Sequence, residues 1–395
     1  MHKLIRITTI PLSLNLLLRG QLSFLSQYYA VSAISGKGKD LEEVGIREGV
    51  RTIEIKMERG ISILQDLKSF WQLYKCFRKE KPQIIHSITP KAGLLSMAAG
   101  YFARVPIRMH TFTGLIFPSK TGLLKRLLIF MDRCLCFFAT NVYPEGEGVK
   151  RDLIQYEITK KPLKILANGN VNGVDISYFS PYAIPKEEKS ALCHNLGIKA
   201  KDFVFVFVGR LVGDKGINEL IAAFVKLDSL IEKNKTNKKD VVKLLLVGPF
   251  ESQLDPLKPE TLKEIQNNAN ILSVGFQPDV RPYFSISNVL LFPSYREGFP
   301  NVVLQAGAMG LPSIVTDING SNEIIEEGTN GIIIPVRHTE ALYKAMNEIF
   351  FNKNFRYTLG ENSRQVIKDR YERTKIWEAL LAEYKHLEAG LHKNV

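Results

Sequence analysis

The segment Phe203-Val-Phe-Val-Phe-Val-Gly-Arg-Leu-Val-Gly-Asp-Lys-Gly216 decides the fold class of this chain. Its first six residues are all apolar, which is typical of a strand buried on both faces of a parallel sheet. A glycine turn follows that carries two cations, Arg210 and Lys215, and a helix is expected from Ile217. A buried strand that passes through a glycine turn into a helix is the repeating unit of a doubly wound α/β domain.

The same alternation of short apolar strands and longer amphipathic helices runs through the whole chain. Strands are expected at Leu4–Thr9, Ala30–Ile34, Thr52–Ile55, Ile84–Ser87, Ile107–Thr111, Thr140–Val142, Lys164–Leu166, Val204–Val208, Val241–Val247, Ile271–Val274, Val289–Phe292, Ser313–Thr316 and Gly331–Ile334. Helices are expected between them, notably at Ser62–Lys79 and Gly93–Ala103, and Lys233–Asp240 is expected as a solvated loop.

The strands fall into two groups, separated by a stretch rich in Gly, Asn, Pro and charge at Asn168–Lys189. We therefore expect an N-terminal doubly wound domain at 1–170 and a C-terminal one at 171–372. The linker is expected at about 168–200. Residues 373–395 are expected to form a helix that packs back on the N-terminal domain.

Composition and charge narrow the functional classes. The 395 residues are 45% hydrophobic and 24% charged, which excludes a disordered chain and a polytopic membrane protein. The formal net charge is +13, and residues 1–167 carry the whole excess. Such an asymmetry indicates an anionic partner of the first half: a membrane surface, a nucleic acid or a phosphorylated substrate. The four cysteines have neither the spacing of a zinc site nor that of a disulfide framework.

A second strand, loop and helix carries further polar groups, in Phe292-Pro-Ser-Tyr-Arg-Glu-Gly-Phe-Pro-Asn301. The helix expected from Asn301 directs its first amides toward the loop, where they can hold an anion. Because a carboxylate beside an anion is unfavourable, Glu297 is better suited to accept hydrogen bonds from neutral hydroxyls, as of a sugar. Arg210 and Lys215 on the first loop can face a diphosphate from one side.

With these two loops the chain resembles the retaining glycosyltransferases of the GT-B fold, family 4, especially the bacterial capsular and lipopolysaccharide types. The resemblance covers nearly the whole chain and is strongest over Phe203–Glu327. It implies two Rossmann-like domains that face a cleft. It further implies that Arg210 and Lys215 hold the donor diphosphate and that Glu297 binds the donor sugar. The residues whose backbone would line the sugar and phosphates are Gly298, Phe299, Pro300 and Asn301.

One position departs from the family pattern. Where the family has a second glutamate that binds the nucleotide ribose, this chain has Gln305. A carboxylate accepts from both ribose hydroxyls, whereas an amide oxygen accepts while its NH2 group donates. About 1 kcal/mol of ribose binding is at stake.

The first half adds weaker candidates. By the resemblance, His110 reaches the donor sugar or its phosphate across the cleft. His86 and Lys91 are candidates for the acceptor side, with Lys91 binding an acceptor phosphate. Gly20 follows the first strand at the place of the family's glycine loop, although the usual glycine pair is absent.

The sequence contains no Asp-x-Asp metal clamp, no His-Glu-x-x-His and no P-loop. We therefore expect no metal and no cofactor, with the nucleotide diphosphate sugar as a donor substrate. The resemblance implies retaining transfer of a hexosyl group to a lipid-diphosphate-linked saccharide in surface polysaccharide synthesis. It places the enzyme in the cytoplasm, peripherally on the inner face of the membrane, with the basic N-terminal domain on the anionic lipid.

Three alternatives stay open from the sequence. The same fold and donor loops would serve a nucleotide-sugar epimerase or a phosphorylase. A protein of another functional class, a basic nucleic-acid-binding protein, is also possible from the sequence. It would contact the nucleic acid through Lys75–Lys81 or Leu123–Phe138. The segment Gly122–Phe138 has the residue pattern of an interfacial membrane helix, and also that of an ordinary domain helix with solvated cations.

Overall fold

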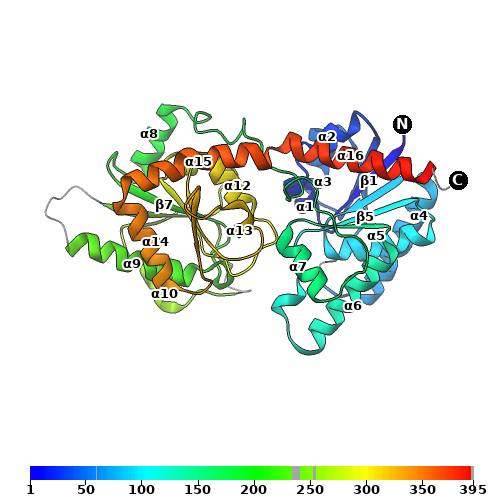
Figure 1. Cartoon of the computed structure of the whole chain (residues 1–395), viewed down its shortest axis with the longest axis horizontal. Coiled ribbons are helices and arrows are strands. Elements are labelled where there is room, and N and C mark those ends of the chain that lie inside the picture. The colour runs from blue at the N-terminus through cyan, green and yellow to red at the C-terminus, as the bar shows by residue number, and fades with distance from the viewer. Residues whose placement is uncertain (59, 234–240, 252–254, 393–395) are drawn as a thin grey trace. The chain divides into compact units, whose positions relative to one another are not determined.

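The computed structural model of the chain describes residues 1–58, 60–233, 241–251 and 255–392. It divides into two compact units (Figure 1). Unit 1 comprises Met1–Gly173 together with Arg373–Val395, and unit 2 comprises Val174–Glu372. The chain therefore leaves unit 1, builds unit 2 and returns.

Unit 1 is built on a parallel sheet whose described strands run in the order β3-β2-β1-β4-β5-β6. The strands are β1 (Lys3–Ile7), β2 (Ala30–Ser35), β3 (Arg51–Glu54), β4 (Ile84–Ser87), β5 (Ile107–Phe112) and β6 (Asn141–Pro144). The helices are α1 (Pro11–Leu17), α2 (Gln21–Ser26), α3 (Lys39–Glu48), α4 (Ile63–Glu80), α5 (Pro90–Phe102), α6 (Gly122–Phe138), α7 (Glu147–Gln155) and α16 (Arg373–His392), with a 3-10 turn η1 (Phe117–Ser119).

Helices cover both faces of this sheet. One core joins Ile5 and Ile7 of β1 to α4–α7, for example through Phe77. The other joins Leu4 to α1–α3 and to α16, through Leu380 and other residues. Figure 1 shows α16, in red, beside α2, so the end of the chain completes the second core of unit 1.

Unit 2 repeats the plan with its described strands in the order β12-β11-β10-β7-β8-β9, again parallel. They are β7 (Phe203–Val208), β8 (Val242–Val247), β9 (Ile271–Ser273), β10 (Val289–Phe292), β11 (Ser313–Thr316) and β12 (Gly331–Ile334). The helices are α8 (Lys186–Asn195), α9 (Ile217–Lys233), α10 (Pro259–Asn267), α11 (Arg281–Ser285), α12 (Asn301–Ala308), α13 (Ser321–Ile324), α14 (Thr339–Phe351) and α15 (Lys353–Tyr371), with a 3-10 turn η2 (Gly213–Lys215).

The expected fold class is confirmed. The first five residues of β7 are buried, as its apolar run predicts. The strand expected at Lys164–Leu166 is wrong, because this segment is irregular in the structure. Its apolar side chain Leu166 packs against the core that includes α16, and this burial produces a strand-like sequence pattern without a neighbouring strand to pair with. Of the loop expected at Lys233–Asp240, Lys233 ends α9 and residues 234–240 lie outside the described residues.

The strand order fixes where ligands are expected. In a doubly wound sheet, ligands bind at the carboxyl ends of the strands where the order reverses. That point lies between β1 and β4 in unit 1 and between β7 and β10 in unit 2. Among the described helices, none is both long and apolar enough to cross a bilayer.

Candidate active site

The two loops singled out in the sequence of unit 2 both lie at its switch point. Strand β7 pairs with β10 in parallel, with Leu290 opposite Val206. The loop that follows β7 carries Arg210 and Lys215, and the loop that follows β10 carries Glu297. Because both strands end at the same edge of the sheet, residues more than eighty positions apart become neighbours.

Lys215 and Glu297 form an ion pair across the two loops. Their side chains are only 15% and 18% exposed, so the pair is held in one place rather than moving in solvent. Ser294 Oγ donates a hydrogen bond of 2.9 Å to the same oxygen, Glu297 Oε1. The Lys215 ammonium also lies 5.8 Å from the centroid of the Phe292 ring. The site thus places one cation and one carboxylate side by side.

Arg210 lies on the same loop but is more accessible. Its side chain is 45% exposed and its Nη1 donates to Glu251 Oε2 at 2.8 Å. An exposed ion pair of this kind contributes little to stability, since water and salt screen it. The Arg210 guanidinium can therefore change partner at small cost when an anion arrives.

A second pair of residues, which the sequence reading missed, ties the loops together. Arg296 Nη2 donates to Asp214 Oδ2 at 3.1 Å, and the Tyr295 amide donates to the carbonyl of Asp214 at 2.9 Å. Asp214 and Arg296 lie directly beside Lys215 and Glu297 in sequence. Charged residues next to the predicted ones were the only signal available, and charge alone does not reveal a partner on another loop.

Glycine allows the two loops to approach this closely. Gly216 has a positive φ of 72°, and a Cβ built on it would lie 2.1 Å from the carbonyl oxygen of Pro293. The same holds on the other side of the second loop, where a Cβ on Gly320 would lie 2.4 Å from the carbonyl oxygen of Gly298. Any side chain at either position would push the loops apart.

The residues after Glu297 lead into the N-terminus of α12. Pro300 is the N-cap residue, and Asn301 is the first helical residue. Phe299 is buried and its ring packs against Tyr371, which anchors the loop in the core of unit 2. Gly298 and Gln305 are partly exposed. The first turn of α12, with the positive end of the helix dipole, therefore starts at the loop that carries Glu297.

In unit 1 the structure places His110 inside the protein. It is 1% exposed, its Nδ1 lies 2.8 Å from Ser87 Oγ, and its ring meets the edge of Phe112. Gly93 packs directly on this ring, since a Cβ there would lie 2.6 Å from it. Burial lowers the pKa of His110 to about 3, so the ring is neutral. The structure therefore does not bring His110 to a surface where it could contact a donor sugar.

Lys91 and Gly20 are also engaged within unit 1. Lys91 is 6% exposed and its ammonium lies 2.5 Å from Asp66 Oδ2, so an acceptor phosphate would have to replace Asp66. Gly20 has a φ of 80° and its amide donates to Glu48 Oε1 at 2.9 Å. A Cβ on Gly20 would lie 2.8 Å from the Trp377 side chain, so this glycine makes room for α16.

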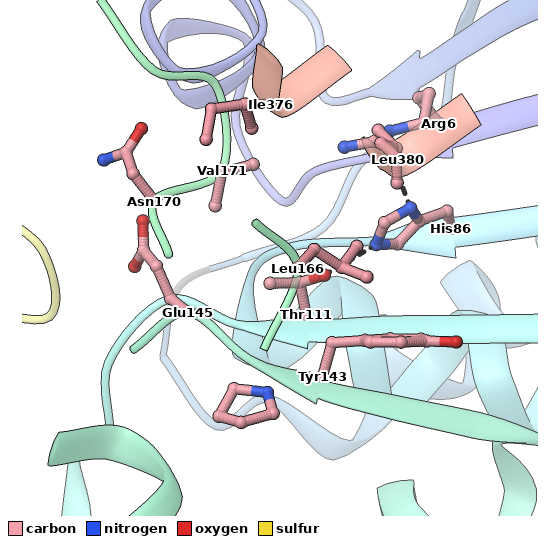
Figure 2. A pocket seen from close by; sticks show the side chains of 11 residues that line it. Arg6, His86, Thr111, Tyr143, Glu145, Leu166, Asn170, Val171, Ile376 and Leu380 are labelled. Carbon is pink, nitrogen blue, oxygen red and sulfur yellow. Dashed lines mark hydrogen bonds between the residues drawn. The ribbon is translucent and has the colours of Figure 1, made fainter. Parts of the chain in front are cut away.

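His86 lines a pocket at the switch point of unit 1 (Figure 2). Its Nδ1 is within 2.8 Å of Arg6 Nη1, and its Nε2 is within 2.8 Å of Thr111 Oγ1. The sequence reading missed Arg6. A charged residue in the middle of an apolar strand was the available signal.

Comparison with known proteins gives the family of both units. The family model described as "Glycosyl transferases group 1" matches residues 189–366, and that described as "Glycosyl transferase 4-like" matches residues 15–144. The capsular polysaccharide biosynthesis glycosyltransferase CapM of Staphylococcus aureus is 30% identical over 97% of this chain and 97% of its own length.

A further relative and a solved structure agree with this. A galactosyltransferase of Escherichia coli, whose name gives UDP-Gal as donor and GlcNAc-diphosphoundecaprenol as acceptor, is 29% identical over 80% of this chain and 79% of its own. The crystal structure of Alr3699/HepE of Anabaena in complex with UDP and glucose superposes with a TM-score of 0.78. It is 17% identical and covers 98% of this chain and all of that one, so it shows the shared two-domain fold.

Proposed function

Because this chain belongs to the group 1 glycosyltransferases, we propose that it transfers a hexosyl group from a nucleotide diphosphate sugar to a lipid-linked saccharide, with retention at the anomeric carbon. The observation that carries the proposal is the meeting of Lys215 and Glu297 at the switch point of unit 2. The names of the Staphylococcus aureus and Escherichia coli relatives support a surface polysaccharide and a lipid-diphosphate acceptor.

In this mechanism the two cations of the first loop act on the leaving group. Lys215 and Arg210 neutralise the charge that develops on the departing nucleotide diphosphate, which is the electrostatic stabilisation expected to dominate. In the free protein Glu297 pairs with Lys215 and Glu251 pairs with Arg210. The amides at the start of α12 add a further partial positive charge for the phosphates.

Glu297 then positions the donor sugar. Once Lys215 pairs with the diphosphate, Glu297 Oε1 accepts hydrogen bonds from sugar hydroxyls while Ser294 continues to fix the carboxylate. The acceptor hydroxyl attacks from the face of the leaving group, and the departing phosphate takes its proton. Gln305 binds the ribose in place of the family's glutamate.

Donor binding and transfer test this assignment. A donor present at about 100 times its dissociation constant adds about 2.7 kcal/mol of stability, which a panel of UDP, GDP and other nucleotide sugars reveals as thermal stabilisation. Arg210→Ala and Lys215→Ala should both lose this stabilisation and the transfer activity. Lys226→Ala is the matched control, since Lys226 is an exposed lysine of α9 paired with Glu340. Normal donor binding and transfer in both site variants would refute the assignment.

Two further readouts separate the proposal from its alternatives. Incubation with donor alone should leave the sugar unchanged, whereas an epimerase would convert it without an acceptor. The anomeric configuration of the product, measured by NMR, should match that of the donor. An inverted product would contradict retention.

We further propose that the enzyme binds peripherally to the cytoplasmic face of the membrane, through an aromatic ridge on unit 1. The ridge is formed by Trp71 of α4, Tyr101 and Phe102 of α5, and Phe137 of α6. All four side chains are exposed, Phe137 by 70%. Tyr101 and Phe137 have ring centroids 6.3 Å apart, and Phe70 links Trp71 to Phe102 at 6.0 Å from each.

Cations flank the aromatic ridge. Lys75 lies one helical turn from Trp71, Arg133 lies one turn from Phe137, and both are exposed. Helix α6 packs on the core through Leu135 and Cys136 and, in part, through Leu128, Ile129 and Phe138. Its other face is exposed and carries the apolar side chains of Leu123, Leu124, Leu127, Phe130 and Phe137. Exposed aromatic residues among cations are suited to an anionic lipid surface, where each cation contributes about 1 kcal/mol.

Vesicle flotation tests this docking surface. The protein should float with vesicles that contain phosphatidylglycerol and much less with pure phosphatidylcholine. The double variant Trp71→Ser/Phe137→Ser should lose flotation, whereas Tyr357→Ser, a change of an exposed aromatic residue of unit 2, should retain it. Equal flotation of both variants would rule out the ridge as the docking surface.

A further inference from the structure

Unit 1 contains a buried cation without a carboxylate partner. Arg6 lies on β1 between the core residues Ile5 and Ile7 and is 0% exposed. The ion pairs found among the described residues include none to Arg6. Taking a guanidinium out of water is unfavourable by several kcal/mol unless it is paired and fully hydrogen-bonded. Such a group in a native protein points to a missing partner.

One edge of this guanidinium is satisfied by the protein. Arg6 Nη1 donates to the Tyr384 hydroxyl of α16 at 2.7 Å and to His86 Nδ1 at 2.8 Å. Because Nδ1 accepts, the proton of the ring is on Nε2, which donates to Thr111 Oγ1 at 2.8 Å. Burial, together with the charge of Arg6, lowers the pKa of His86 well below its usual range, so the ring is neutral. Arg6 therefore carries the charge of this network.

The other edge is unsatisfied. Nε and Nη2 of Arg6 are both buried and have no hydrogen-bond partner. These two nitrogens form the side-on fork of a guanidinium, with parallel N–H bonds at the spacing of two oxygens of a carboxylate or a phosphate. The geometry that remains open is thus the one that binds an oxyanion through two hydrogen bonds.

The surroundings of Arg6 form a pocket at the point where ligands of such sheets bind. Arg6 is opposite His86 in the register of β1 and β4, the two strands between which the order of unit 1 reverses. The pocket is partly open to solvent, and the space in it that the centre of a water-sized sphere can occupy is about 20 Å³. Its polar lining consists of Arg6, His86, Thr111, Tyr143, Glu145 and Asn170.

The two ends of the pocket differ in charge. Figure 2 shows Arg6 and His86 at one end and Glu145 with Asn170 at the other. A ligand group that carries negative charge is favoured at the Arg6 end, and hydroxyl groups that donate hydrogen bonds are favoured at the Glu145 end. An acidic sugar has both kinds of group.

We propose that this pocket binds an oxyanion group, a carboxylate or a phosphate, carried by the acceptor saccharide, through the Nε and Nη2 fork of Arg6. The proposal rests on the proposed function, because it names the acceptor class of unit 1 as an acidic saccharide. The apolar wall formed by Leu380 and Ile376 of α16 excludes water from the bound group and strengthens its pairing with Arg6.

The test measures anion binding to the whole chain without a donor. Glucuronate, inorganic phosphate and neutral glucose are titrated at constant ionic strength, and thermal stabilisation is recorded. Glucuronate or phosphate should stabilise the protein and glucose should not; the two anions show whether the group is a carboxylate or a phosphate. In Arg6→Met the apparent dissociation constant should rise by about tenfold or more, as expected for loss of a charge-assisted pair.

Two control variants locate the response. Arg108 is a partly buried guanidinium of β5 whose Nε and Nη1 donate to the carbonyls of Phe138 and Val105, so Arg108→Met should bind the anion as the wild type does. Lys215→Ala removes a cation of the donor loops and should also retain the response. If phosphate stabilisation disappears in Lys215→Ala and persists in Arg6→Met, the anion binds unit 2 and the proposal is overturned.

A second variant keeps the test decisive should Arg6→Met not fold. Arg6→Lys keeps the charge and most of the volume but has no fork, and its anion affinity should fall clearly below that of the wild type. An unchanged affinity in Arg6→Lys, or no response of the wild type to either anion, overturns the proposal. Thermal stabilisation by the donor, measured on the same proteins, tells the two proposals apart. A wild type that responds to the anion but is not stabilised by any donor contradicts the proposed function and leaves the anion site supported.

Discussion

Replacing Gly216 with alanine should separate the loops that follow β7 and β10. Gly216 lies between Lys215 and α9, with a φ of 72°, and its position against Pro293 sets the distance between the loop after β7 and the loop after β10. A Cβ at this glycine would lie 2.1 Å from the Pro293 carbonyl oxygen, whereas real Cβ contacts below 3.0 Å are essentially never seen. One loop must therefore move by about 1 Å, and Lys215 moves with it.

The expected loss in the free energy of unfolding has two parts. A left-handed conformation with a Cβ is unfavourable by about 1–2 kcal/mol, and forcing extra volume into a packed site by about 1–3 kcal/mol. Gly216→Ala should thus lower the free energy of unfolding by about 2–5 kcal/mol. A displacement of about 1 Å between Lys215 and Glu297 should also reduce the transfer rate by about 100-fold.

Gly197 provides the control. It follows α8 with a φ of 64°, and nothing lies within 4 Å of a Cβ built there. Gly197→Ala should therefore show only the conformational part, about 1–2 kcal/mol, with normal transfer. Urea unfolding and transfer assays on both variants make the comparison. Equal losses of stability in the two variants, or full activity of Gly216→Ala, would refute the reasoning.

Three other predictions concern unit 1 and the chemistry. Asp66→Asn leaves Lys91 as an unpaired buried cation and should reduce stability by about 3–5 kcal/mol in urea unfolding, a loss that the double variant Asp66→Asn/Lys91→Met should largely avoid. Burial raises the pKa of Asp132 to about 7, so the folded chain keeps a proton there that the unfolded chain loses. The free energy of unfolding should then fall as the pH rises from about 4 to 7, and Asp132→Asn should remove that fall in urea titrations across this range. Transfer should continue in EDTA, since no metal is expected in the reaction; abolished activity that Mg²⁺ restores would contradict this.

The fold was open to prediction because its signals are local. The apolar run of β7, its glycine turn and the helix after it are contiguous, and the same holds for β10, the Glu297 loop and α12. The strand prediction at Lys164–Leu166 was wrong because burial against a core and pairing in a sheet select the same apolar side chains. A sequence pattern reports burial and not the neighbour that causes it.

In the candidate site, too, the residues with local sequence signals could be predicted and those that depend on packing could not. Lys215 and Glu297 could be predicted together because each follows a strongly marked strand. His110 and Lys91 carry chemical groups that suit a ligand, yet Ser87 and Asp66 engage them inside unit 1. These partners are set by packing between elements, which spacing does not encode. Arg6 shows most clearly that the partners of a side chain cannot be predicted from nearby sequence, since one of them, Tyr384, lies 378 positions away.

The return of the chain to unit 1 has a consequence for the order in which the protein matures during synthesis. Unit 2 is a continuous segment, complete once Glu372 has been translated, whereas unit 1 still lacks α16 at that moment. The buried residues Leu380 and Tyr384 belong to α16, so a nascent unit 1 exposes the core that they cover and leaves Arg6 without its hydroxyl partner. Domains of nascent chains usually mature from the N-terminal end. Here unit 2 is finished in chain order before unit 1, and the pocket around Arg6 forms only after α16 has been added.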